Sequence, residues 1–127
     1  ALPVAVLDAG ALLGWLGAAN MQVEGDWHIA SALVTEAAMS EAVHFLVTFH
    51  DGNDAALEAD LVALQLAPTL TTPVLPLAVA SRDALATCEE WGLATTVALA
   101  RAQGLPLISL SPVDAVGVLA MRMRRAY

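Results

Sequence analysis

A short apolar run that ends in one carboxylate constrains the fold of this chain more than any other stretch. Residues 4–7 read Val-Ala-Val-Leu, Asp8 follows, and residues 9–19 are rich in Ala and Leu. The run is typical of a strand buried on both faces of a sheet, and the stretch after it predicts a helix. We therefore expect Asp8 at the carboxyl end of a strand, the edge at which open α/β sheets bind ligands. Asp is also a favoured helix N-cap, so a capping role is the alternative.

Strand and helix patterns alternate along the rest of the chain. Helical spacing covers residues 36–50, 55–66, 82–91 and 94–103, and apolar strand candidates cover 32–35, 74–79 and 105–110. A short helix is expected from residues 27–30 and another over 113–119, with loops at 20–26 and 68–73, while 121–127 forms an edge strand or stays loose. This alternation predicts one α/β domain over residues 1–127, with a central parallel sheet between two layers of helices.

Individual residues mark where these helices begin and end. Thr35 is expected to cap the helix over 36–50, and Asn53 or Asp54 the helix after it. Gly92 is expected to break or kink a helix, and Gly104 to close one in the position after its last turn.

The charge balance restricts the partners that the chain can have. It carries 13 Asp and Glu against 5 Arg and no Lys, a net charge of −8. Such a surface repels nucleic acid at long range, so any contact with RNA must be local, through a metal or a few Arg. Hydrophobic residues make up 58% of the chain, and this surplus favours a partner, most simply a second copy in a homodimer.

No stretch predicts a membrane span. Residues 61–81 carry no charge, but Pro68, Pro73 and Pro76 interrupt them. The apolar N-terminus lacks a basic region and contains Asp8, which makes it a poor signal peptide. Cys88 is the single cysteine, so no disulfide can form within the chain, which fits a reducing compartment. We expect a soluble, cytoplasmic protein.

Several carboxylates are candidates for a shared site. Glu41 interrupts an apolar helix face, and Asp114 follows the expected strand 105–110, at the same sheet edge as Asp8. Taken singly, each is explained as a cap or a solvated surface acid. Together they favour a hard divalent cation, Mg²⁺ or Mn²⁺, because clustered carboxylates disfavour one another's ionised forms. Such a cation can activate water against a phosphodiester. No glycine-rich phosphate loop, zinc spacing or nucleophile elbow competes with this interpretation.

The order of these pieces resembles the PIN domain, the nuclease fold of VapC-type toxins. Residues 6–13 look like its opening, 33–46 like its second motif, 93–100 like its third and 109–115 like its fourth. In one subgroup a short acidic-aromatic-His step resembles residues 25–28. The resemblance implies a four-stranded parallel sheet between helices, Mg²⁺ or Mn²⁺ in an acidic pocket, and cleavage of single-stranded RNA. It also implies homodimers and a small antitoxin protein that fills the groove.

Under this resemblance, two of the principal acids are kept and two are replaced. Asp8 and Glu41 fall in register, and Asp114 resembles a secondary acid of the fourth motif; these three are the candidate catalytic and metal-binding residues. Leu93 and Ser111 stand where the third and fourth motifs have Asp. Glu90, one turn before Leu93, is a further candidate metal ligand, and the Ser111 hydroxyl could orient a water.

Two functions therefore remain open. The first is a Mg²⁺- or Mn²⁺-dependent ribonuclease with a weakened or altered site. The second is a catalytically inactive PIN-fold module that binds a protein or dimerises.

Overall fold

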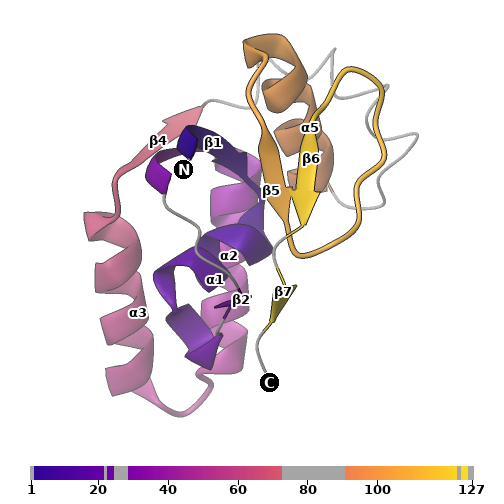
Figure 1. Ribbon diagram of the computed structural model, residues 1–127. Helices are drawn as coiled ribbons and strands as arrows, with labels where there is room; N and C mark the ends of the chain where they lie inside the picture. The colour runs from indigo at the N-terminus through magenta and orange to yellow at the C-terminus, as the bar shows by residue number, and fades with distance from the viewer. Residues whose placement is uncertain (1, 22, 25–28, 73–90, 123, 126–127) are drawn as a thin grey trace.

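A parallel sheet forms the centre of the molecule. The computed structural model describes residues 2–21, 23–24, 29–72, 91–122 and 124–125. Within them, five parallel strands lie in the order β4-β3-β1-β5-β6 (Figure 1). Their bounds are β1 Leu2–Leu7, β3 Ile29–Thr35, β4 Thr69–Thr72, β5 Leu107–Ser109 and β6 Ala120–Arg122. The expected α/β fold with a parallel sheet is confirmed, and β1, the apolar run of the sequence, lies at its middle.

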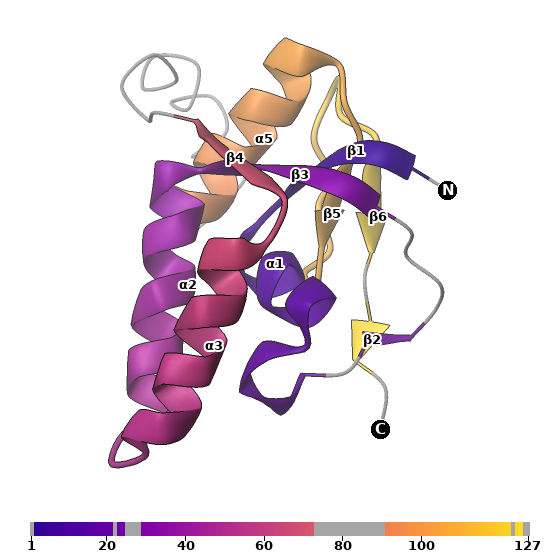
Figure 2. The same cartoon turned by 90° about the vertical axis from the view of Figure 1, so that its left-hand side faces the viewer.

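Four helices pack on this sheet among the described residues. They are α1 Ala9–Leu16, α2 Glu36–Phe49, α3 Asp54–Leu66 and α5 Trp91–Gln103, and a 3-10 turn, η1 Ala18–Asn20, follows α1. Helices α2 and α3 lie side by side, and α5 crosses near the start of α2 (Figure 2). A separate antiparallel pair joins β2 Val23–Glu24 to β7 Arg124–Arg125.

The side chains of β1 alternate between two cores, one on each face of the sheet. Ala5 and Leu7 belong to the core that includes residues of α1, α2 and α3, whereas Val6 belongs to the core that includes α5. Successive side chains of a strand point to opposite faces, so a strand covered by helices on both faces must be apolar throughout. This requirement explains why residues 4–7 contain no polar side chain.

The expected helix caps are confirmed. Thr35 Oγ1 accepts a hydrogen bond from the Ala38 amide at 3.1 Å, and Asn53 Oδ1 accepts one from the Ala56 amide at 3.2 Å. Each satisfies an amide that has no partner within its own helix. Gly104 follows α5 with a φ of +64°, the left-handed conformation that glycine adopts without strain.

Two segments between helices are strands where the sequence indicated otherwise. Residues 29–35 form β3, so the helix expected from residues 27–30 is wrong for residues 29 and 30, and residues 25–28 lie outside the described residues. The loop expected at 68–73 contains β4, whose four residues are Thr-Leu-Thr-Thr. The β-branched threonines favour a strand. Pro68 has no N–H to donate, but its carbonyl accepts a hydrogen bond from the Ala32 amide at 3.0 Å and so extends the pairing with β3.

The chain after β4 differs from expectation in two further places. Helix α5 begins at Trp91 and continues through Gly92, so no break occurs there. Residues 111–119 form a loop rather than a short helix, with Gly117 at a φ of +76° and the Arg101 Nε–H donating to the Val116 carbonyl at 3.0 Å. The strand expected at 74–79 and the helix expected at 82–91 lie outside the described residues, except for Trp91. Among the helices that the structure does describe, none has the length and apolar character needed to cross a bilayer.

Candidate functional site

Asp8 begins α1 and is held at both carboxylate oxygens. Its Oδ1 accepts a hydrogen bond from the Ala11 amide at 2.8 Å, which makes it the N-cap, and Ser109 Oγ donates to its Oδ2. Asp8 is only 8% exposed. Burying a carboxylate without hydrogen-bond donors is costly, and these two hydrogen bonds offset part of that cost at the carboxyl end of β1.

Ser109 is a site residue that the sequence did not single out. It ends β5, is fully buried, and its Oγ also accepts from the Ser111 amide at 3.0 Å. The pairing of Leu7 with Ile108 brings the following residues, Asp8 and Ser109, to neighbouring positions at the sheet edge. The one sign of this role in the sequence is a hydroxyl at the end of an apolar strand. The sequence does not reveal that this strand lies beside β1, so the contact with Asp8 could not be predicted.

Glu41 lies on α2 and contacts the first turn of α5. Its Oε1 accepts a hydrogen bond from the Gly92 amide at 2.9 Å. A Cβ placed on Gly92 would lie 2.4 Å from the Glu41 Cδ, so only glycine lets the carboxylate approach this closely. The contact satisfies one of the free amides at a helix N-terminus and puts a negative charge at the positive end of the helix dipole.

Threonine hydroxyls complete the junction between α2 and α5. Thr95 and Thr96 both donate to the Gly92 carbonyl, at 2.9 and 2.7 Å, and the hydroxyls of Thr35 and Thr95 are 2.8 Å apart. All three threonines are fully buried. The start of α5 is therefore fixed to the end of β3 and to α2 by side-chain hydrogen bonds as well as by packing.

A groove of about 680 Å³ is lined by Glu41 and by the residues that follow Asp8. It runs between α1, α2 and the end of β5, and Glu41 is the one acid among its lining residues. The residues directly after Asp8 form part of its wall. The lining is Ala9, Gly10, Leu13, Met21, Ser40, Glu41, His44, Phe45, Thr48 and Leu110. Its character is mainly apolar, with hydroxyls, one imidazole and one carboxylate along α2.

The other predicted site residues take different positions. Asp114 and Ser111 are exposed in the loop after β5. Leu93 is partly buried and packs against the core beneath α5. Glu90 lies outside the described residues. Within the part of the chain that the structure describes, no group of three or more His, Cys, Asp or Glu is placed to hold a metal ion.

The structure thus places Glu41 in the lining of the groove and Asp8 directly before the lining residue Ala9, and each carboxylate is bonded to the N-terminus of a helix. Comparisons of the chain with protein-family models, with curated proteins and with solved structures found no match.

Proposed function

We propose that this chain is a PIN-like domain that acts by binding a partner protein in the groove beside α2. The proposal of a PIN-like fold is supported by the parallel sheet, by Asp8 at the end of its central strand and by Glu41 on α2. The apolar surface at the groove carries the proposal of protein binding. The two carboxylates support it, because each already stabilises the start of a helix.

The apolar surface continues from the groove along α2. Phe45 lines the groove and is 40% exposed, and Phe49, one turn later, is 49% exposed. Their rings stack with centroids 5.8 Å apart. Fully burying one such side chain contributes about 1.5–3 kcal/mol, so a partner that covers both rings gains a substantial binding free energy. Exposed aromatic side chains beside a hollow are typical anchors of protein interfaces.

Charge indicates the chemistry of the partner. The chain has a net charge of −8, and Glu41 places a carboxylate within the groove. A segment that combines apolar side chains with Lys or Arg would be steered to this surface and would pair with it. A small basic partner protein, such as the antitoxin that the resemblance implies, has this character. A second copy of the chain is the other candidate occupant, and it would bring a like charge of −8.

Replacing Phe45 with Asp is expected to weaken the binding of basic amphipathic peptides at least about tenfold, because the anchor ring is replaced by a charge. The probes are peptides selected from a random helical display library against the wild-type protein. Their affinities are measured by fluorescence anisotropy at low and high salt. The selected sequences should pair apolar residues at helical spacing with Lys or Arg, and their binding should weaken as salt rises.

The matched control replaces another exposed apolar residue, Val62 on α3, with Asp. Val62 is 46% exposed and does not line the groove. V62D should bind the selected peptides as the wild type does. Peptides that bind F45D and the wild type equally would place the binding surface elsewhere and contradict the proposal. If the wild type instead forms a concentration-dependent dimer that F45D dissociates, the occupant of the groove is a second copy of the chain rather than a partner protein.

A metal-dependent ribonuclease is the second candidate, favoured by one observation. Glu41 lines the groove, Asp8 at the carboxyl end of β1 directly precedes the lining residues Ala9 and Gly10, and both supply the oxygen donors that Mg²⁺ and Mn²⁺ prefer. These two residues would hold the cation, with Asp114 and Glu90 as further acids and Ser111 to orient a water. The cation would supply a water activated for attack on a phosphodiester of single-stranded RNA.

Mn²⁺ binding measured by calorimetry tests this candidate without a known substrate. If the site holds metal, the wild type binds Mn²⁺ in the micromolar-to-millimolar range, and both D8N and E41Q lose that binding. Both substitutions are close in shape and remove one negative charge, and Asn remains a good N-cap at position 8. The control is D51N, which removes an exposed charge from the turn after α2. Equal binding by all four proteins would contradict a site at Asp8 and Glu41.

A further inference from the structure

A short segment with a strained backbone contributes Met21 to the lining of the groove. Residues 17–21, named here the strap, lead from α1 through η1 to Met21, whose side chain lines the groove. Gly17 has a φ of +69° and Ala19 a φ of +51°. The left-handed conformation is ordinary for Gly17 but disfavoured for Ala19, because its Cβ approaches the backbone. Such a conformation persists only where the surroundings hold it.

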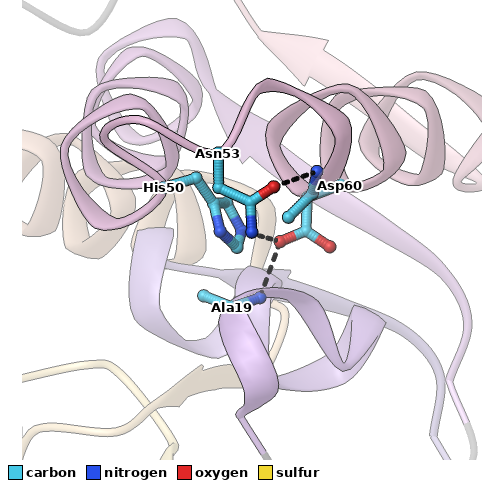
Figure 3. Close-up of polar contacts among 5 residues, drawn as sticks. Ala19, His50, Asn53 and Asp60 are labelled. Carbon is cyan, nitrogen blue, oxygen red and sulfur yellow. Dashed lines mark hydrogen bonds and ion pairs between the residues drawn. The ribbon is translucent and has the colours of Figure 1, made fainter.

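Asp60 is the side chain that holds the strap. Its Oδ2 accepts a hydrogen bond from the Ala19 amide at 2.8 Å, and the same oxygen lies 2.6 Å from His50 Nε2 (Figure 3). Asp60 comes from α3, His50 caps the end of α2, and Ala19 lies in η1. A single carboxylate oxygen therefore joins three elements of the fold.

The surroundings of His50 keep this carboxylate in position. The His50 side chain is 9% exposed and its ring packs edge-on against Phe49, with centroids 4.9 Å apart. The backbone N–H of Asn53 donates to the backbone carbonyl of His50 at 2.8 Å, which fixes the turn between α2 and α3. Within the strap, the Met21 amide donates to the Ala18 carbonyl at 3.0 Å. Ala18, Ala19 and Met21 are buried in the core, and Asp60 is the side chain that hydrogen-bonds the strap to the α2–α3 pair.

We propose that the strap is a movable wall of the groove, closed by the Asp60 bond to Ala19. When that bond breaks, Ala19 leaves the left-handed conformation and Met21, which lines the groove together with Leu13 and Phe45, moves outward and widens it. Movement of the strap would regulate access to the groove. Only this regulatory role rests on the proposed function. The movement itself occurs without any partner and is measured without one.

Hydrogen exchange of individual amides, followed by NMR, tests the movement. Asp60→Ala should raise the exchange rate of the Ala19 and Met21 amides about tenfold or more, as expected when a charge-assisted hydrogen bond is lost. The amides of Leu12 and Leu64, in the adjoining helices, should change less than about threefold. Asp60→Asn keeps a neutral acceptor and should give an intermediate increase.

The matched control is Asn53→Ala, which removes the cap of α3 without touching the strap. It should raise exchange in the first turn of α3 and leave Ala19 unchanged. Binding of the dye ANS then reports the groove: D60A should bind several-fold more than the wild type, and N53A should not. The added substitution Phe45→Asp should abolish the gain, because Phe45 lines the groove.

Two results would overturn the proposal. The first is an Ala19 amide that exchanges at the wild-type rate in D60A. The second is an equal rise throughout α1 and α3, which would make Asp60 a general stabiliser rather than the link to one segment. Failure of the peptides to bind would remove the proposed function and leave these exchange results intact.

Discussion

Replacing Ser109 with Ala is expected to lower the free energy of unfolding by about 3 kcal/mol. The substitution removes the hydroxyl that donates to Asp8 Oδ2 and accepts from the Ser111 amide. Asp8 would remain 8% exposed with one donor fewer, and a lost bond to a buried charge costs about 1.5–3 kcal/mol. The amide of Ser111 loses its acceptor as well. Urea denaturation followed by circular dichroism measures the change.

Ser111→Ala is the matched control, because the two serines are neighbours in the chain and differ in burial. Ser109 is 1% exposed and Ser111 is exposed in the loop. S111A should stay within about 0.5 kcal/mol of the wild type, as surface substitutions usually do. Equal losses in S109A and S111A would mean that the Ser109–Asp8 bond contributes nothing to stability.

Replacing Gly92 with Ala is expected to lower the free energy of unfolding when Glu41 is present and to raise it when Glu41 is replaced. With Glu41 present, the new Cβ collides with the Glu41 carboxylate and breaks its hydrogen bond to the Gly92 amide. The free energy of unfolding then falls by about 1–2 kcal/mol. With Glu41 changed to Ala, the three atoms that lie closest to the new Cβ are removed, and Ala is the better helix former by up to about 1 kcal/mol. The double-mutant cycle G92A, E41A and G92A/E41A should therefore give a coupling of about 2 kcal/mol.

A second cycle with Ser40 controls for general effects on α2. Ser40 precedes Glu41 and is exposed, and no close contact to Gly92 involves it. S40A and G92A should add to within about 0.5 kcal/mol. Additive behaviour of E41A and G92A would show instead that the carboxylate moves aside at no cost.

Local features of the fold could be predicted from the sequence because their causes are local. Thr35 and Asn53 cap helices through amides three residues later, and the spacing of apolar residues identifies α2 and α3. Strand β4 was missed because its threonines lie between Pro68 and Pro73, which look like the ends of a loop. Its pairing with β3 is a contact between distant residues, and no local pattern reports it.

The candidate site divides in the same way. Asp8 could be placed at a strand end and helix start from its neighbours, and Glu41 was selected because it interrupts an apolar helix face and falls in register with the second motif of the resemblance. The partners that fix them, Ser109 and Gly92, are 101 and 51 residues away in the chain. Gly92 was interpreted as a helix break, because its requirement for a missing Cβ comes from Glu41 on another helix.

The packing of Leu93 restricts which side chains this position can accept. In the proposed PIN-like alignment Leu93 replaces an acid, and in this chain it packs against the core that contains Val6, Val97 and Leu107. A change of Leu93 to Asp would put a charge against these apolar neighbours and would be destabilising. An acid at this position therefore requires further substitutions in the core around it, whatever function the acid would serve.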